Sequence, residues 1–325
     1  MIRYGEGVTH VAATTAAQQR PRFIRIAVGV QIVAVPCIIG VLSWIAFDRS
    51  EALKPKGSHW LLFLALLALE ASLLCFAARL RFSLRALGVQ LPLKTSMLIA
   101  LQSLFYFFIP LSIGTDAVRW MKIQTRLPEV SRTVILTAVL FDRATAAVAC
   151  LIIGLATLRF VESVRVEIPW PTGGTQSGLL IAAAVLLTVS ALAVTVVLAR
   201  RHRHQLSMLC SRRFAANACI GLVLSIFTQG FTILTIWSSF QWIGLGLDPA
   251  GIAFGVTGGA LAQVIPLSLA GAGPSEVTAG FLSAAAGATT EQAVLLASMV
   301  YFCKLICGIE GGLLEWPPIA RRIRV

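Results

Sequence analysis

Six predominantly apolar segments, each long enough to cross a bilayer, constrain this chain more than any other feature of its sequence. A hydrocarbon core about 30 Å thick is crossed by roughly 20 apolar residues in an α-helix. Hydrophobic residues make up 57% of the 325 residues and charged residues 13%, well below the charged share of a soluble domain. We therefore expect an all-α membrane protein, with spans at 23–47, 59–78, 133–158, 178–199, 218–245 and 292–314.

The basic residues set the expected orientation. The net charge is +13, and most Lys and Arg fall in short segments between apolar runs, which is typical of cytoplasmic loops rather than of a nucleic-acid surface. Residues 1–20 are polar and are expected to be a disordered cytoplasmic tail, and residues 21–325 a single membrane domain of the kind found in bacterial inner membranes. Both termini are then cytoplasmic, and the basic loops face anionic lipid heads.

Two further apolar stretches, 96–113 and 252–270, are broken near their ends. Proline and glycine interrupt a helix, and irregular backbone at membrane depth is tolerated only inside protein or beside a water-filled cavity. Basic clusters flank the first stretch, and both stay cytoplasmic only if that stretch enters the membrane and returns. We therefore expect two re-entrant helical hairpins. The residues expected at the breaks are Pro110, Gly114, Thr115, Pro266, Gly271 and Gly273.

Two strings recur in the same order in the two parts of the chain. Each broken stretch contains Ile-Pro-Leu-Ser, then glycine, then an acid, and the next span carries a Phe-x-cation string. The acid and the cation are 27 residues apart in the first part and 28 in the second. On the expected topology the halves, about 23–158 and 178–314, form an inverted repeat, as in transporters with a site near the midplane. The alternative is a coincidence of apolar composition. The matched positions are 109–112 with 265–268, Asp116 with Glu276, and 141–143 with 302–304.

Charged side chains within the membrane are costly and are functional candidates. We expect the acid and the cation of each half to pair, and the helices after the breaks to point backbone N–H groups at the gap, an arrangement that suits a phosphate headgroup. The alternative is that the ion pairs only hold helices together. The cysteines and histidines show no metal-binding or catalytic spacing, so no metal, cofactor or catalytic residue is expected. The candidate substrate-binding residues are Asp116, Arg119, Asp142, Arg143, Glu276 and Lys304.

The runs at 109–119, 141–143 and 265–276 resemble the lysylphosphatidylglycerol synthase transmembrane region, a family of flippase-like membrane proteins. The chain departs from the family pattern at Lys304, where arginine is usual, and at Pro274. The resemblance implies a membrane domain that moves a modified phospholipid across the bilayer. The soluble synthase domain of the best-known members is not expected here, so synthase activity is not implied. The positions that match the family pattern are Pro110, Gly114, Asp116, Arg119, Pro266, Gly271, Gly273 and Glu276.

The function we expect is therefore that of a lipid flippase for a polar- or phosphate-headed lipid, and not that of an enzyme. One alternative is a membrane enzyme that transfers a glycosyl or aminoacyl group from a lipid carrier, with Asp116 or Glu276 as general base. Product formation by the purified protein would favour it. Another alternative is a secondary transporter of a small ion, which predicts a site closed to lipid on every side.

Overall fold

The computed structural model describes residues 56–108, 114–158, 160, 211–263 and 273–315, all of which lie in one compact unit, Pro55–Val325. The expected tail at 1–20 and the expected spans at 23–47 and 178–199 lie outside the described residues. So do Pro110, Pro266 and Gly271. Within the described part of the chain every regular element is helical: eight α-helices and one short 3₁₀ helix.

Four of the described helices are long and apolar enough to cross a membrane. They are α3 (His59–Ala86), α6 (Arg132–Leu158), α9 (Arg212–Ile243) and α12 (Thr290–Glu315), and they confirm four of the six expected spans. With 26 to 32 residues each, they are about 39–48 Å long at 1.5 Å per residue. Large apolar side chains on their outer faces remain exposed, as a lipid-facing surface requires.

The expected end of the span at 59–78 is wrong, because α3 continues through Arg79, Arg81 and Arg85. No proline or glycine interrupts this part of the sequence, and the helix ends only before Gly88, whose φ of 79° breaks the helical path. Hydropathy alone stops at the first arginine. The helix does not, because arginine is a good helix former.

The start of α9 also differs from the expected 218. Ser211 caps this helix, with its hydroxyl accepting a hydrogen bond from the N–H of Phe214 at 3.0 Å, so the helix begins at Arg212. It ends at Gly244, whose φ is 80°. The two arginines in the first turn of α9 are therefore helical residues at the end of a span rather than part of a loop.

Four shorter helices lie on either side of the two predicted breaks. The first break is preceded by α4 (Leu93–Leu104) with the 3₁₀ helix η2 (Phe105–Phe108), and α5 (Gly114–Arg126) follows it. Before the second break lies α10 (Pro249–Ala262), and after it α11 (Pro274–Ala285). The α-helices contain 12 to 14 residues, about 18–21 Å, which is shorter than a bilayer core. The starts of α5 and α11 agree with the sequence prediction.

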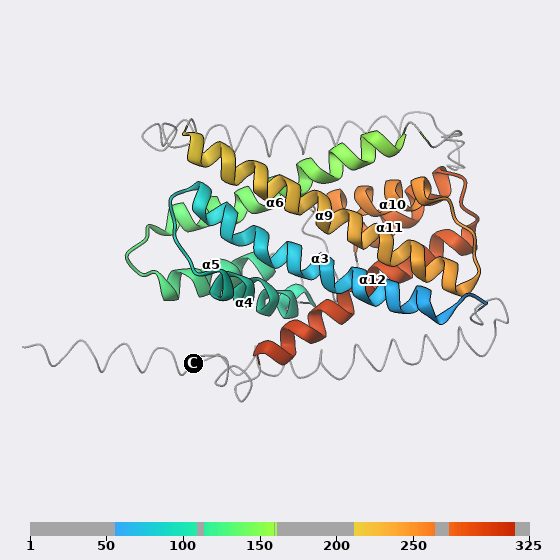
Figure 1. The fold of residues 1–325 in the computed structure, drawn as a ribbon, viewed down its shortest axis with the longest axis horizontal. Coiled ribbons are helices and arrows are strands. Elements are labelled where there is room, and N and C mark those ends of the chain that lie inside the picture. The colour runs from blue at the N-terminus through green and yellow to red at the C-terminus, as the bar shows by residue number, and fades with distance from the viewer. Residues whose placement is uncertain (1–55, 109–113, 159, 161–210, 264–272, 316–325) are drawn as a thin grey trace, which may run out of the picture. The chain divides into compact units, whose positions relative to one another are not determined.

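The long helices α3 and α9 lie side by side and run in opposite directions (Figure 1). The N–H groups of Lys56 and Gly57, just before α3, donate to the carbonyl of Trp242 at the end of α9, at 3.1 and 2.8 Å. Near the middle of the pair, the Ser72 hydroxyl donates to the Thr228 carbonyl at 3.0 Å.

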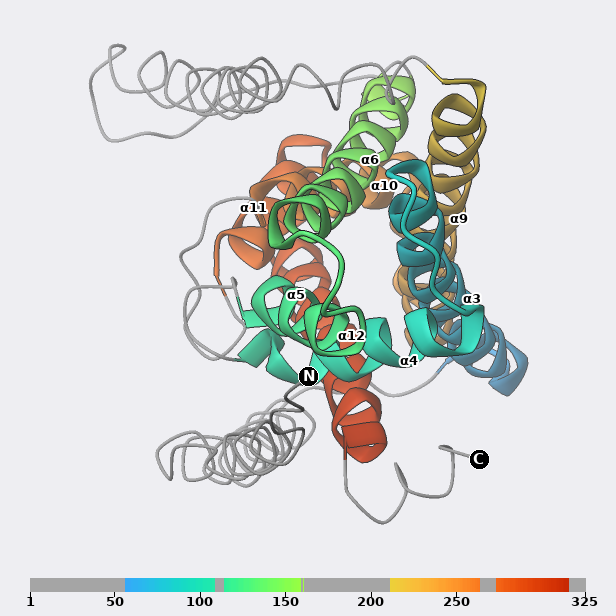
Figure 2. The ribbon, with the colours of Figure 1, turned by 90° about the vertical axis from the view of Figure 1, so that its left-hand side faces the viewer.

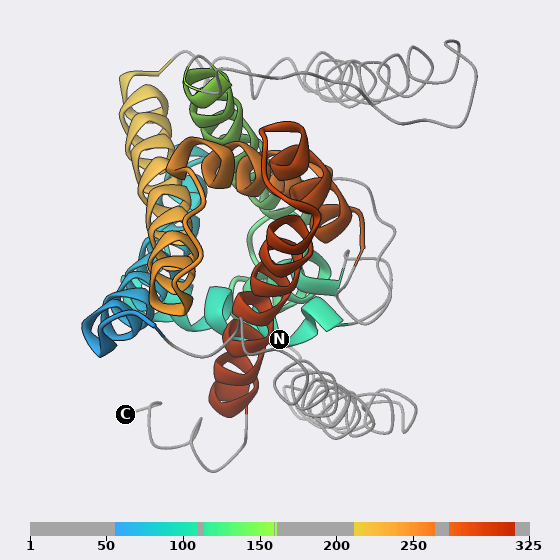
Figure 3. The same cartoon turned by 90° about the vertical axis from the view of Figure 1, so that its right-hand side faces the viewer.

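The remaining helices exchange partners between the two parts of the chain. Helix α4 packs on α12, and α6 packs on α10 (Figures 2 and 3). Close approach at α12 depends on Gly311, where an added Cβ would lie 2.5 Å from the carbonyl oxygen of Leu101. One buried apolar cluster is formed by α3, α4, α5 and α6, and a second by α9, α10, α11 and α12.

Candidate functional site

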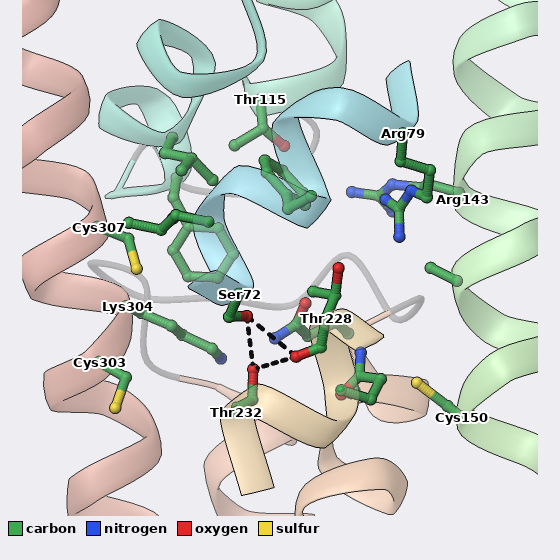
Figure 4. A pocket seen from close by; sticks show the side chains of 18 of the residues that line it. Ser72, Arg79, Thr115, Arg143, Cys150, Thr228, Thr232, Cys303, Lys304 and Cys307 are labelled. Carbon is green, nitrogen blue, oxygen red and sulfur yellow. Dashed lines mark hydrogen bonds between the residues drawn. The ribbon is translucent and has the colours of Figure 1, made fainter. Parts of the chain in front are cut away.

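A cavity of about 280 Å³ lies among helices from both parts of the chain (Figure 4). Much of its wall is apolar, formed by residues such as Leu73, Phe76 and Val300. Its described lining contains four cationic side chains and only one carboxylate. These charged lining residues are Arg79, Arg119, Arg143, Lys304 and Asp116.

Asp142 lies behind the cavity wall and holds Arg79 in place. The carboxylate is 1% exposed and accepts two hydrogen bonds from the Arg79 guanidinium, from Nε and Nη2, each at 2.8 Å. The Ser83 hydroxyl donates a further bond to Asp142 at 3.0 Å, and Arg79 Nη1 donates to Ser225 Oγ on α9 at 3.2 Å. This two-bond geometry ties α3 to α6 and fixes one cation at the cavity.

Arg119 connects the two carboxylates of the first half. Its Nη1 lies 3.4 Å from Asp142 and 3.7 Å from Asp116, and its Nε donates to Ser103 Oγ at 2.8 Å. The guanidinium also stands over the ring of Phe76, 4.6 Å from the ring centroid. Asp116 forms a second ion pair with Arg143 on α6. Three arginines therefore converge on two carboxylates.

The second half contributes a smaller cluster. Lys304 on α12 pairs with Glu276 at the start of α11 and donates to the Ser275 hydroxyl. Glu276 also accepts hydrogen bonds from the backbone N–H of Gly273 and from Ser275, both at 2.8 Å. The Glu276 carboxylate thus caps its own helix, so the Gly273 N–H is not among the backbone donors that were expected to point at the gap. The Lys304 ammonium also lies 5.0 Å from the ring centroid of Phe107.

The charges of these two clusters do not cancel. Four cations face three carboxylates, which leaves a net charge of +1 if all seven groups are ionised. The carboxyl groups of Glu310 and Glu70 lie outside these two clusters and act electrostatically on Cys307, which also lines the cavity. Among the described residues, no group of three or more His, Cys, Asp or Glu could hold a metal ion.

A family model described as the lysylphosphatidylglycerol synthase TM region matches residues 23–309. The chain belongs to this family. The match covers every helix described above except the last residues of α12, and it includes all the charged residues of the cavity. It makes the protein an integral membrane protein related to lipid-modifying or flippase-like proteins. No curated protein and no solved structure matches the chain.

Most of the site residues predicted from the sequence line the cavity or lie directly behind its wall. Thr115, Asp116, Arg119, Arg143 and Lys304 line the cavity. The two remaining charged candidates lie behind the lining. Asp142 on α6 pairs with Arg79 and Arg119. Glu276 on α11 pairs with Lys304. The expected ion pairs of Asp116 with Arg143 and of Glu276 with Lys304 are both present, and Gly114 and Gly273 stand at the starts of α5 and α11.

Sequence reasoning missed Arg79, which had the appearance of a loop residue after an apolar run. The helical spacing of Ser72, Arg79 and Ser83 offered a signal, because positions separated by seven and eleven residues lie on one helix face. A stripe of polar residues on one face of an otherwise apolar span indicates a buried polar surface. Extending the expected span by two helical turns beyond residue 78 would have placed Arg79 and Ser83 on this polar face.

Proposed function

We propose that this protein is a lipid flippase of the bacterial inner membrane. A polar or phosphate headgroup crosses through the cavity between two inverted halves, while the acyl chains remain in the lipid. The observation that carries this proposal is the cavity itself, which gathers four cations from α3, α5, α6 and α12 among apolar walls. A cationic, hydrogen-bonding cavity in a membrane protein replaces the water that a headgroup loses on leaving the surface.

The inverted repeat is supported by the antiparallel pair of α3 and α9. The repeated Ile-Pro-Leu-Ser strings begin at Ile109 and Ile265, 156 residues apart. Ser72 and Thr228, which hydrogen-bond at the crossing of α3 and α9, are also 156 residues apart. In two halves related by a twofold axis, equivalent residues meet only at the axis. An axis through this contact, perpendicular to two antiparallel helices, lies in the plane of the membrane.

Contacts away from the axis support the same relation. On α4 and α12, the Gln102 side chain donates to the carbonyl of Leu314 at 2.8 Å. On α10 and α6, the Thr257 hydroxyl lies 3.2 Å from the position of an added Cβ at Gly154. Before the breaks, equivalent positions of the two halves are 156 residues apart, so the equivalent of Gln102 is position 258, next to Thr257. The second break is longer, so after the breaks the offset is 160 residues, as between Asp116 and Glu276, and the equivalent of Gly154 is Leu314. The two contacts are therefore near equivalents with the halves exchanged.

The orientation is part of the proposal. Both termini are cytoplasmic, and exposed basic residues such as Arg126 and Arg213 contact anionic lipid heads. The short helices around each break form hairpins that enter the bilayer and return, because none is long enough to cross it.

The test is headgroup accessibility in proteoliposomes. Phospholipids with a fluorophore on one acyl chain are reconstituted with the purified protein, and a membrane-impermeant reductant bleaches the outer leaflet. Protein-free vesicles retain about half of the signal, and an active flippase lowers this plateau. We expect an Arg143→Ala, Lys304→Ala double variant to slow the loss at least tenfold.

The matched control is an Arg126→Ala, Arg213→Ala double variant, which also removes two cations but leaves the cavity lining unchanged. It should flip lipid as the unaltered protein does. Equal rates for the unaltered protein and the cavity variant would refute the proposal. Release of a new glycosyl- or aminoacyl-lipid product by the purified protein would instead favour the membrane enzyme.

A further inference from the structure

The helix pairs beside the two breaks differ in how they are fastened to the rest of the protein. Helix α5, after the first break, is held by charged side chains. Its Arg119 donates to the Ser103 hydroxyl on α4 at 2.8 Å. Its Lys122 donates to the Gln102 carboxamide on α4 at 2.8 Å and pairs with Glu315 on α12. Any shift of α5 along α4 or α12 therefore breaks hydrogen bonds to charged groups, which are stronger than neutral ones.

The equivalent contacts between α10 and α11 contain no polar side chain. Equivalent positions are 156 residues apart before the breaks and 160 after them. By these offsets, the arginine contact of α5 on α4 corresponds to Ala279 beside Gly259, where an added Cβ would lie 2.9 Å from the Ala279 Cβ. The lysine contact corresponds to Leu282 beside Gly258, where an added Cβ would lie 2.0 Å from Leu282 Cδ1. Both helix pairs thus make the same two contacts, but charge and hydrogen bonds are present there in the first pair alone.

One polar connection holds α11 to the other described helices. Lys304 on α12 pairs with Glu276 and donates to the Ser275 hydroxyl. The hydroxyl of Ser283, further along α11, donates to the Gly280 carbonyl of the same helix at 2.8 Å. Within the described residues, no other side-chain hydrogen bond or ion pair joins α11 to another helix. Loss of the Lys304 contact would therefore leave α11 attached to α10 and α12 by apolar packing.

The surfaces on which α11 packs are smooth. From α10, Cβ atoms added at Gly255 and Gly259 would lie 2.8 and 2.5 Å from carbonyl oxygens of α11. Toward α12, a Cβ added at Gly280 would lie 3.4 Å from the Ala297 Cβ. Helices that meet through glycine do not interlock by ridges of side chains, so one can shift on the other without rotamer changes. Glycine stripes also occur in fixed contacts. The scarcity of polar ties on α11, compared with α5, favours movement here.

We propose that α11 is the moving gate of the cavity and that Lys304 is the latch that holds it closed. With the latch closed, Glu276 at the start of α11 lies against Lys304, which lines the cavity. With the latch open, α11 shifts on α10 and α12, while α5 stays fastened and α10 stays packed on α6. The inference rests on the proposed function for what passes the gate, but the movement of α11 can be measured without transport.

The experiment locks α11 to α12 with a disulfide. Bonded cysteines have Cβ atoms about 3.5–4.5 Å apart, close to the 3.4 Å between a Cβ added at Gly280 and that of Ala297. The Gly280→Cys, Ala297→Cys variant is reconstituted, and labelled phospholipid that reaches the outer leaflet is extracted with albumin, so that no reductant meets the bond. Oxidation should slow flipping at least tenfold, and later reduction should restore it in the same vesicles. Mass spectrometry of the linked peptides distinguishes the bond from bonds of the native cysteines.

The matched control links α6 to α10, two helices that we expect to stay together. A Cβ added at Gly154 would lie 3.9 Å from the Cβ of Thr257, so a Gly154→Cys, Thr257→Cys variant can form a disulfide of the same kind. Its oxidised form should flip lipid within twofold of its reduced form, because this bond joins helices that keep their contact when the gate opens.

The rate at which each disulfide forms reports the position of α11 without transport. The bond between positions 280 and 297 forms only while α11 lies closed against α12. Adding Lys304→Met should open the latch and slow the formation of this bond at least threefold, whereas Lys304→Arg, which keeps the positive charge, should slow it less. Neither substitution should change the rate at which the control bond between α6 and α10 forms.

The outcomes separate this inference from the flippase proposal. Undiminished flipping with the α11 bond in place, or equal losses from the two bonds, would overturn the gate even though lipid is flipped. An unchanged rate of bond formation after Lys304→Met would overturn the latch, as would failure of the α11 bond to form when the control bond does. If the unaltered protein flips no lipid, the flippase function is refuted, whereas slower formation of the α11 bond alone would still support a mobile, latched α11.

Discussion

Replacing both Asp142 and Arg79 by apolar residues should restore most of the stability that either single replacement removes. Asp142→Leu leaves the Arg79 guanidinium, 4% exposed, without its two 2.8 Å bonds. Arg79→Met leaves the carboxylate, 1% exposed, with only the Ser83 bond and the longer contact to Arg119. Each single change therefore strands a buried charge.

The magnitude follows from that stranded charge. Removing one partner of a buried ion pair costs about 3–5 kcal/mol, whereas replacing both partners by apolar residues of similar volume is often neutral. We expect Asp142→Leu to lie at the upper end, because it deprives two arginines of a carboxylate, and Arg79→Met at the lower end. If the double variant loses only about 1 kcal/mol, the coupling energy between the two positions is about 7 kcal/mol, the sum of the two single losses minus the loss in the double variant.

The assay is reversible unfolding in mixed micelles, with the free energy of unfolding taken for the unaltered protein, both single variants and the double variant. A control cycle uses Arg126→Met and Glu129→Leu, two exposed residues at the end of α5 and just after it. Their coupling energy should stay within about 0.5 kcal/mol. A coupling below about 1 kcal/mol for Asp142 and Arg79 would show that the pair is not the buried two-bond contact described here.

Two further changes probe helix packing. Gly311→Val should prevent accumulation of monodisperse protein in detergent, because its Cβ would lie 2.5 Å from the backbone of α4. The control is Gly221→Ala, whose Cβ has no atom within 4 Å and which should be tolerated or slightly stabilising. Comparable yields of the two variants would contradict the close approach of α12 to α4. Lys122→Met should lower the free energy of unfolding by about 1–3 kcal/mol, since it loses its pair with Glu315 at the end of α12, and Lys122→Arg should recover at least half of that loss in the same unfolding measurement.

The sequence predicted the interruptions of the helices because those are local. Proline removes a donor and glycine frees the backbone, so the starts of α5 and α11 at Gly114 and Pro274 follow from the residues themselves. The charged residues of the site were also accessible to sequence reasoning, because charge within an apolar span is conspicuous. Arg79 was missed because hydropathy locates the end of an apolar run, not the end of a helix.

The sequence by itself determined that the chain is a helical membrane protein, that two stretches are broken, and which acids and cations are candidates for a site. Those properties depend on residues near one another in the chain. Only the tertiary structure decided which cations line the cavity and which carboxylates hold those cations in place. It also showed that Gln229 and Gln263 line the same cavity. Such roles depend on contacts between helices far apart in sequence, such as Arg79 with Asp142, where burial and geometry select one partner among several of the same charge.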